Sequence, residues 1–228
     1  MVNGEKHFSK NEKDFSTIII ENIIDKVSSS IKSTGRCIMA ISGGRTPIIV
    51  YKEIIKPKYA KVIDWSKLHI LFTDERCVGK NHSENNFFNC YKNWLQYYPG
   101  ISYSRIKSWW PPQITSKNYE SLIKNKFSEI DIIFMGMGED GHVASLFPDY
   151  DFQNTSNFKL VEPIFHKKSN TFRITMTTKL LNSAKTRIFG IVGSKKKDVF
   201  MDLEKGNYRD YPIQYLINRN CKDKWILL

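Results

Sequence analysis

The chain has few cysteines, no long apolar run and no low-complexity stretch, and each absence excludes a class of protein. The four cysteines, Cys37, Cys77, Cys90 and Cys221, are scattered without a CxxC pair. We therefore expect reduced thiols, not a disulfide framework or a zinc site. No apolar run is long enough to span a membrane, and residues 1–14 lack the apolar stretch of a secretion signal. These absences favour a cytoplasmic protein without membrane contact.

Carboxylates are outnumbered by basic side chains, which gives the 228-residue chain a net charge of +12. The lysines are spread along the sequence, and the densest cluster is only Lys195–Lys197. Because no RNA-binding motif, zinc knuckle or basic tail accompanies the charge, we do not expect nucleic-acid binding, which stays a distant alternative. A scattered solvated surface is the simplest interpretation, and its field would also attract a phosphorylated metabolite.

Apolar segments alternate between strand-like and helix-like patterns. We expect strands at 36–42, 68–73, 131–135, 172–177, 187–192 and 225–228, and helices at 11–32, 46–56, 83–95, 116–129 and 194–204. Thr46 is the expected N-cap of the second helix, with Pro47 in its first position. This alternation predicts an α/β fold of one domain, residues 1–228, with a mostly parallel sheet between two helical layers. Residues 1–10 are expected to form a flexible amino-terminal tail.

The most informative motif is MGMGEDGHVASLFP at residues 135–148, directly after an apolar strand. Open α/β sheets bind ligands at the carboxyl ends of their strands, and histidine is suited to proton exchange near neutral pH. His142 is therefore the candidate base, and Asp140 can orient it or tune its pKa. Residues 143–147 are expected to begin a short helix. The alternative is a tight glycine turn with a surface histidine.

A second motif, ISGGRTP at residues 41–47, joins a strand to a helix. Gly43 and Gly44 let the backbone approach a ligand, and the amides at the helix start can hold a phosphate. Arg45 adds a planar cation suited to phosphate oxygens. The motif is neither a Walker A loop nor GxGxxG, and an ordinary strand–helix turn is the alternative.

Two further groups of charged residues follow predicted strands. Asp74, Glu75 and Arg76 end one strand, where Arg76 can stabilise negative charge on a substrate oxygen and a neighbouring carboxylate can position it. Arg173 shares a strand face with two threonines, and Lys196 lies at a helix start. The alternatives are a surface ion pair for the first group and solvated cations for the second.

These motifs, together with SENN at 83–86, RITMTTKLLNSA at 173–184 and GSKK at 193–196, resemble the 6-phosphogluconolactonase family in order and approximate spacing. This family is a branch of the glucosamine-6-phosphate isomerase/6-phosphogluconolactonase superfamily. The resemblance implies a Rossmann-like parallel sheet and hydrolysis of 6-phospho-D-glucono-1,5-lactone to 6-phosphogluconate in the oxidative pentose phosphate pathway. It implies a small sugar-phosphate substrate and no metal or organic cofactor.

The resemblance also implies roles for individual residues. His142 matches the family's catalytic histidine, which would take a proton from water and return it to the departing ring oxygen, while Arg76 and loop amides stabilise the oxyanion. The expected phosphate ligands are Gly43, Gly44, Arg45, Arg173 and Lys196. Asp74 and Asp140 complete the catalytic group, and Ser42, Thr46, Glu75 and Gly141 complete the binding group.

Some features depart from the family or leave alternatives open. Position 45 is often serine in the family, and the carboxyl-terminal Trp225–Leu228 lacks the usual acid. The Lys-, Asn- and Ile-rich composition suggests an AT-rich genome, and in some parasites of that kind this domain is fused to glucose-6-phosphate dehydrogenase, which makes such a fusion or association an expectation here. A glucosamine-6-phosphate deaminase would supply an acid after the histidine, but residues 144–148 contain none. A non-catalytic sugar-phosphate-binding protein is the other alternative, and retention of His142 argues against it.

Overall fold

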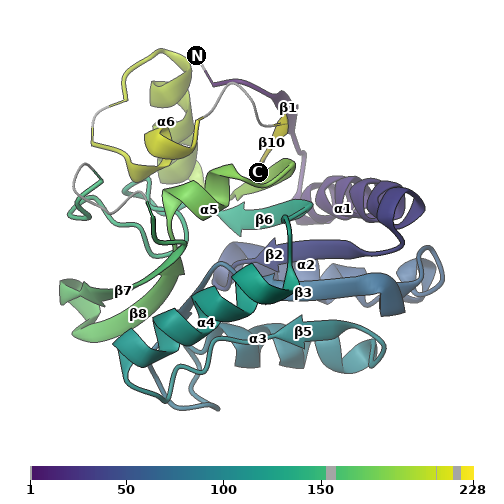
Figure 1. Ribbon diagram of the computed structural model, residues 1–228. Coiled ribbons are helices and arrows are strands. Elements are labelled where there is room, and N and C mark those ends of the chain that lie inside the picture. Colours follow the sequence, from purple (N-terminus) through teal and green to yellow (C-terminus); the bar gives the residue numbers. More distant parts are fainter. Residues whose placement is uncertain (1, 153–157, 209, 218–221) are drawn as a thin grey trace.

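Strands and helices alternate along the chain and form a parallel sheet with helices on both faces, as the sequence predicts (Figure 1). The computed structural model describes residues 2–152, 158–208, 210–217 and 222–228. The strands are β1 (Glu5–Phe8), β2 (Cys37–Ile41), β3 (Leu68–Phe72), β4 (Asp74–Arg76), β5 (Ser102–Ser104), β6 (Ile132–Gly136), β7 (Val161–His166), β8 (Thr171–Met176), β9 (Thr186–Ile191) and β10 (Lys222–Leu227). The α-helices are α1 (Glu12–Thr34), α2 (Arg45–Ile54), α3 (Asn86–Asn93), α4 (Pro112–Lys126), α5 (Thr178–Asn182) and α6 (Ser194–Glu204). Short 3-10 helices are η1 (Pro57–Tyr59), η2 (Trp65–Lys67), η3 (Leu95–Tyr97), η4 (Lys167–Ser169) and η5 (Pro212–Leu216).

The main sheet has seven strands in the order β1-β10-β9-β6-β2-β3-β5, and its neighbouring strands run parallel. The chain builds outward from β2 through β3 to β5, then returns to the other side of β2 with β6. The strand order therefore reverses between β2 and β6, which is where open α/β sheets bind ligands. The glycine-rich loops that follow these two strands both begin at this point.

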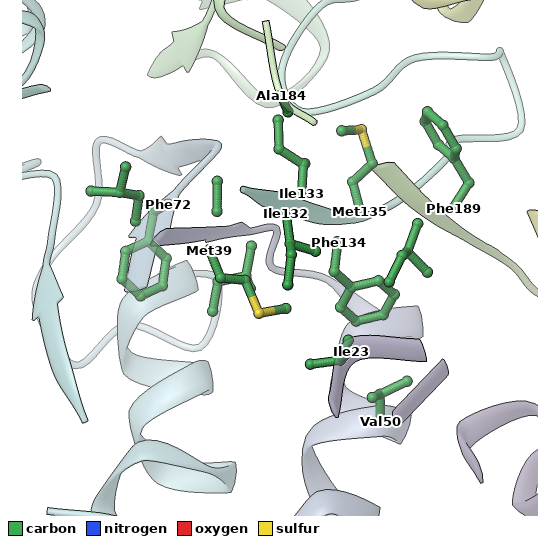
Figure 2. Packing of buried hydrophobic residues seen from close by; sticks show 14 of the residues in the cluster. Ile23, Met39, Val50, Phe72, Ile132, Ile133, Phe134, Met135, Ala184 and Phe189 are labelled. Carbon is green, nitrogen blue, oxygen red and sulfur yellow. The ribbon is translucent and has the colours of Figure 1, made fainter. Parts of the chain in front are cut away.

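The central strands are buried on both faces, which explains their continuous apolar sequences. Figure 2 shows Phe134 of β6 beside Ile23 of α1 and Val50 of α2. Ile133 and Met135 point to the opposite face, as alternation along a strand requires. The core thus lies in two layers, one on each side of the sheet, and holds the ends of β2 and β6 in place.

A second sheet, which the sequence did not predict, has three antiparallel strands in the order β4-β8-β7. The strand expected at 172–177 exists as β8, but it belongs to this sheet. Its partner β4 is the charged segment Asp74–Arg76, and β7 contains Pro163 and has mostly half-buried residues. Neither partner has the alternation that indicates a strand: β4 has only three residues, β7 contains a proline, and both are paired through the backbone with β8.

The ends of several elements differ from expectation. Residues 5–8, expected within a flexible tail, form β1 at the sheet edge, and its polar sequence gave no strand signal because parallel backbone pairing with β10 holds it. Helix α2 begins at Arg45 and not after a Thr46 cap, since Gly44, with a φ of 94°, is the N-cap two residues earlier. Thr46 is buried instead, against positions where β6 and β9 carry the paired glycines Gly136 and Gly190.

Three of the four cysteines, Cys37, Cys77 and Cys90, are free thiols, and Cys221 lies outside the described residues. Within the described ranges, no helix is long and apolar enough to cross a membrane. The same part of the chain contains no group of three or more His, Cys, Asp or Glu side chains arranged to hold a metal ion.

Candidate active site

A cavity of about 670 Å³ lies where the loops after β2 and β6 meet β4 and the start of α6. Most of the predicted site residues line it: Ser42, Gly43, Gly44, Arg45, Thr46, Asp74, Arg76, Asp140, His142 and Lys196. It is also lined by residues outside the predicted set, namely Pro47, Asn86, Gly136, Met137, Gly138, Glu139, Ala144 and Lys168. The predicted residues Glu75, Gly141 and Arg173 do not line it.

His142 and Asp140 form a hydrogen-bonded pair at the cavity. Oδ1 of Asp140 lies 2.5 Å from Nδ1 of His142 and 3.2 Å from its backbone nitrogen, so the carboxylate contacts the histidine at two points. Burial acts to raise the pKa of Asp140, but hydrogen bonds and charge interaction with His142 outweigh it and lower the pKa to about 2. An ionised Asp140 holds Nδ1 protonated, which leaves Nε2 as the nitrogen for proton exchange.

Glycine at position 138 is required by this pair. A Cβ atom there would lie 2.1 Å from Nδ1 of His142 and 2.6 Å from Oδ1 of Asp140. The Gly138 amide also donates a 2.8 Å hydrogen bond to the His142 carbonyl, which closes the loop. Gly141, predicted to bind substrate, instead shapes this loop: its φ is 75°, and its carbonyl accepts a hydrogen bond from the amide of Ile213.

The segment after His142 is not the helix that we expected. A bridge joins Val143 to Leu146, and Ala144 has a φ of 50°, in the left-handed region that an L-residue seldom occupies. The turn brings the Phe147 ring to 4.7 Å from that of His142, while Phe147 stacks at 4.1 Å on His166 of β7. The catalytic loop is therefore packed against the second sheet through three aromatic rings.

The loop after β2 has the geometry expected for an anion site. Gly44 precedes the first turn of α2, and Gly43 lies so close to Asn86 that a Cβ atom would be 1.8 Å from its Oδ1. The Ser42 side chain is used inside the protein, because its hydroxyl pairs with Thr73 at 2.7 Å. Backbone amides and Arg45, more than the Ser42 hydroxyl, are thus the groups that this loop offers to a ligand.

Lys196 approaches the same region from the first turn of α6, which begins after Gly193 with a φ of 100°. Burial, and then the charge of Arg45, lower the pKa of Lys196. Two cations and the amino-terminal ends of two helices therefore meet at one end of the cavity. Such an arrangement favours a dianion, because it relieves the repulsion between Arg45 and Lys196.

Asp74, which lines the cavity, is buried within a polar network. Its Oδ2 accepts a 2.7 Å hydrogen bond from the Ser145 hydroxyl, and its Oδ1 and backbone carbonyl lie 3.3 Å and 3.0 Å from Nδ2 of Asn86. The network joins β4, the start of α3 and the loop that carries His142. Sequence reasoning missed Asn86, although its place in a Ser-Glu-Asn-Asn run at an expected helix start was the available signal.

Arg76 lines the cavity, and one of its terminal nitrogens donates to the Glu84 carbonyl at 2.9 Å. Its Nε finds no hydrogen-bond partner among the residues that the structure describes. Because Arg76 lines the cavity, its guanidinium can face a substrate oxygen while one terminal nitrogen is held by the protein.

Glu75 has a structural place instead of the predicted binding one. Its carboxylate accepts hydrogen bonds from the backbone amides of Arg76, Asn86 and Phe87 at 2.8, 2.7 and 2.9 Å. These contacts fix the start of α3, where free amides need acceptors. Burial raises the pKa of Glu75 to about 7 despite these hydrogen bonds.

Arg173 is buried on β8 beside the site. Its guanidinium lies 5.3 Å from the centre of the Phe147 ring, and burial together with the charge of Arg76 lowers its pKa. Its register partner in the second sheet is Arg76. The two arginines thus form a positive region behind the catalytic loop, although only Arg76 lines the cavity.

Comparisons with a family model and with individual proteins point to the same family. The model of the family described as glucosamine-6-phosphate isomerases/6-phosphogluconolactonase matches residues 10–226. A 6-phosphogluconolactonase of Haemophilus influenzae is 29% identical over 195 residues, covering 83% of each chain. A bifunctional glucose-6-phosphate 1-dehydrogenase/6-phosphogluconolactonase of Plasmodium falciparum is 30% identical over 249 residues, which cover 90% of this chain and 27% of that protein.

Solved structures agree on the fold. The 6-phosphogluconolactonase of Shewanella baltica superposes with a TM-score of 0.89 at 20% identity, covering 99% of this chain and 97% of the other. That of Plasmodium vivax gives a TM-score of 0.84 at 27% identity, covering 99% and 90%. The predicted α/β class and mostly parallel sheet are thereby confirmed.

Proposed function

Because the chain belongs to the family of glucosamine-6-phosphate isomerases and 6-phosphogluconolactonases, we propose that it hydrolyses 6-phospho-D-glucono-1,5-lactone to 6-phosphogluconate. The resemblance to 6-phosphogluconolactonases is confirmed by the relatives that match most of its length, and with it the prediction of a lactone hydrolase. The observation that carries the substrate and the mechanism is the Asp140–His142 pair, which shares one cavity with the Arg45–Lys196 end.

In the proposed mechanism, Nε2 of His142 takes a proton from a water molecule in the cavity. The resulting hydroxide attacks the lactone carbonyl and forms a tetrahedral oxyanion. The C–O bond to the ring oxygen then breaks, and the imidazolium returns its proton to that oxygen, so that His142 ends as it began. Asp140 stabilises the imidazolium between the two transfers, and its low pKa keeps it from competing for the proton.

Negative charge on the carbonyl oxygen needs donors close to His142. Arg76 is the proposed partner, because it lines the cavity and the Glu84 carbonyl holds one of its terminal nitrogens in place. Amides of the loop after β6 would assist it. Preorganised donors of this kind are worth about 3–4 kcal/mol of barrier in other enzymes.

The phosphate group is proposed to bind at the amino-terminal ends of α2 and α6. The amides of Gly43 and Gly44 would hold its oxygens, with Arg45 and Lys196 supplying charge. Arg173 stays in the proposal as a more distant contributor, because it is buried beside Arg76 and does not line the cavity. Asp74 is proposed to act by holding the catalytic loop through Ser145, not by contact with the reacting atoms.

Acid release from freshly prepared 6-phosphogluconolactone, compared with ammonia release from glucosamine 6-phosphate, tests this function. The lactone opens spontaneously, so the rate without enzyme is subtracted. We expect lactone hydrolysis only, because the loop from Ala144 to Pro148 provides no carboxylate to assist opening of an amino-sugar ring. Ammonia release without lactone hydrolysis would overturn the proposal.

Two accompanying expectations extend this function. The Plasmodium falciparum relative is named as a bifunctional glucose-6-phosphate 1-dehydrogenase/6-phosphogluconolactonase. We therefore keep the proposal that this chain is fused to, or associates with, such a dehydrogenase. A dehydrogenase that makes the lactone would hand its product to this site. We also propose the cytoplasmic location that the sequence led us to expect.

A further inference from the structure

The cavity is lined by four cationic side chains, and they come from different parts of the fold. Arg45 and Lys196 lie at the starts of α2 and α6, and Arg76 ends β4. The fourth is Lys168, which belongs to η4 in the turn between β7 and β8. The proposed mechanism assigns no role to Lys168.

The β7–β8 turn is fixed beside the catalytic loop. His166, the residue before η4, stacks on Phe147 at 4.1 Å, and Phe147 lies 4.7 Å from His142. Nδ1 of His166 pairs with the Ser169 hydroxyl at 2.6 Å, which closes the turn around Lys168. Figure 1 shows the β7–β8 pair beside the main sheet. Lys168, in the turn of this pair, lines the cavity.

Lys168 therefore lines the cavity from a turn that packs, through His166 and Phe147, against the loop of His142, whereas Arg45 and Lys196 come from the helix starts. The product of lactone hydrolysis carries two anionic groups, a phosphate at one end and a new carboxylate at the reacting end. With the phosphate at Arg45 and Lys196, the reacting end lies by His142. An ammonium group at this end can pair with the carboxylate once it forms.

We infer that Lys168 binds the acyl end of the ligand: the carbonyl oxygen of the lactone and then the carboxylate of the product. The inference rests on the proposed lactonase function. Lys168 is exposed, so its contact with a ligand is partly screened and contributes to affinity more than to the chemical step.

The neighbouring Lys167 offers a matched control. It is also exposed, but it pairs with Asp149 at 3.6 Å and does not line the cavity. K167M and K168M remove the same charge from adjacent positions of one turn. Neither side chain is part of the core, so both variants should fold like the unaltered chain.

Calorimetric titration with two ligands tests the inference. 6-Phosphogluconate has a carboxylate and a phosphate, whereas glucitol 6-phosphate has only the phosphate. We expect K168M to weaken 6-phosphogluconate binding about five- to tenfold and glucitol 6-phosphate binding less than twofold. K196M should weaken both ligands, and K167M neither.

If K168M lost the same affinity for both ligands, Lys168 would lie at the phosphate. If it lost affinity for neither, Lys168 would have no role in binding. Each result overturns the inference. Lactone hydrolysis by the unaltered chain would in those cases leave the proposed function intact. Failure of the unaltered chain to bind 6-phosphogluconate or hydrolyse the lactone would overturn the proposed function, and the role of Lys168 with it.

Discussion

The hydroxyl of Ser145 donates a 2.7 Å hydrogen bond to Oδ2 of Asp74, although 71 positions separate the two residues in sequence. Both side chains are buried, and the Ser145 amide donates to the Thr175 hydroxyl at 3.2 Å. The loop that carries His142 is therefore anchored to two strands of the second sheet. The position of the catalytic histidine depends on this sheet as well as on β6.

Replacing Ser145 with alanine removes the donor and leaves a buried carboxylate with one fewer hydrogen bond. We expect the free energy of unfolding to fall by about 1–3 kcal/mol, measured by urea denaturation. S145A should also lower kcat, because the anchored loop carries His142. S183A provides a control, since within the described part of the chain the Ser183 hydroxyl bonds only to the nearby Leu180 carbonyl. Equal stability of S145A and the unaltered chain would contradict the anchoring role.

Replacing His142 with alanine should reduce kcat for the lactone about a hundredfold or more, because the proton acceptor is lost. The ring is partly exposed, so the melting temperature should change little. D140N keeps the shape of the side chain but removes its charge, and we expect a smaller loss of about one to two orders of magnitude. Stopped-flow measurement of acid release checks both variants. An unchanged rate in H142A would exclude His142 as the base.

Replacing Gly138 with alanine should disable the site without removing a reactive group. The added Cβ would lie 2.1 Å from Nδ1 of His142, so the ring or the loop must shift. We expect kcat to fall at least tenfold, since hydrogen-bond geometry between base and orienting acid is lost. G100A is the matched control, because a Cβ there meets its nearest atom at an ordinary 3.5 Å and lies outside the cavity. Equal activity of the two variants would contradict the geometry.

Glu75 should contribute a pH dependence to stability. Its pKa is raised by burial from 4.5 to about 7, so the folded chain binds its proton more tightly than the unfolded chain. The stabilisation from this group is complete below pH 4.5 and is lost as the pH rises to about 7. The glutamine in E75Q cannot ionise, so the stability difference between the unaltered chain and E75Q should shrink between pH 5 and pH 7. Urea denaturation at both pH values checks this, and a constant difference would contradict it.

The local signals in the sequence predicted much of the fold. Continuous apolar strands were expected at nearly the places where they occur, because burial on both faces leaves an unbroken apolar run. The helix over 194–204 also occurs where it was expected. The edge strand β1 and the second sheet were not expected. Their residues are polar or mixed and are held by backbone pairing with distant segments, which leaves no periodic signal.

The candidate site shows the same division. Glycine spacing and charged residues after strands indicated His142, Asp140, Arg45 and Arg76, all of which line the cavity. Glu75 was misplaced, because adjacent residues of a strand point to opposite faces and Glu75 turns to the start of α3. Lys168 was missed because the β7–β8 turn itself was not predicted.

The sequence by itself determined the α/β class, the loop with His142 and Asp140, and the glycine turn before α2, because each depends on residues close together in the chain. Only the tertiary structure decided which side chains share the cavity. Parallel pairing of β2 with β6 brings the two glycine-rich loops together, and pairing of β8 with β4 places Arg173 and Arg76 side by side. Contacts between segments so far apart follow from packing of the whole chain, so no local pattern can specify them.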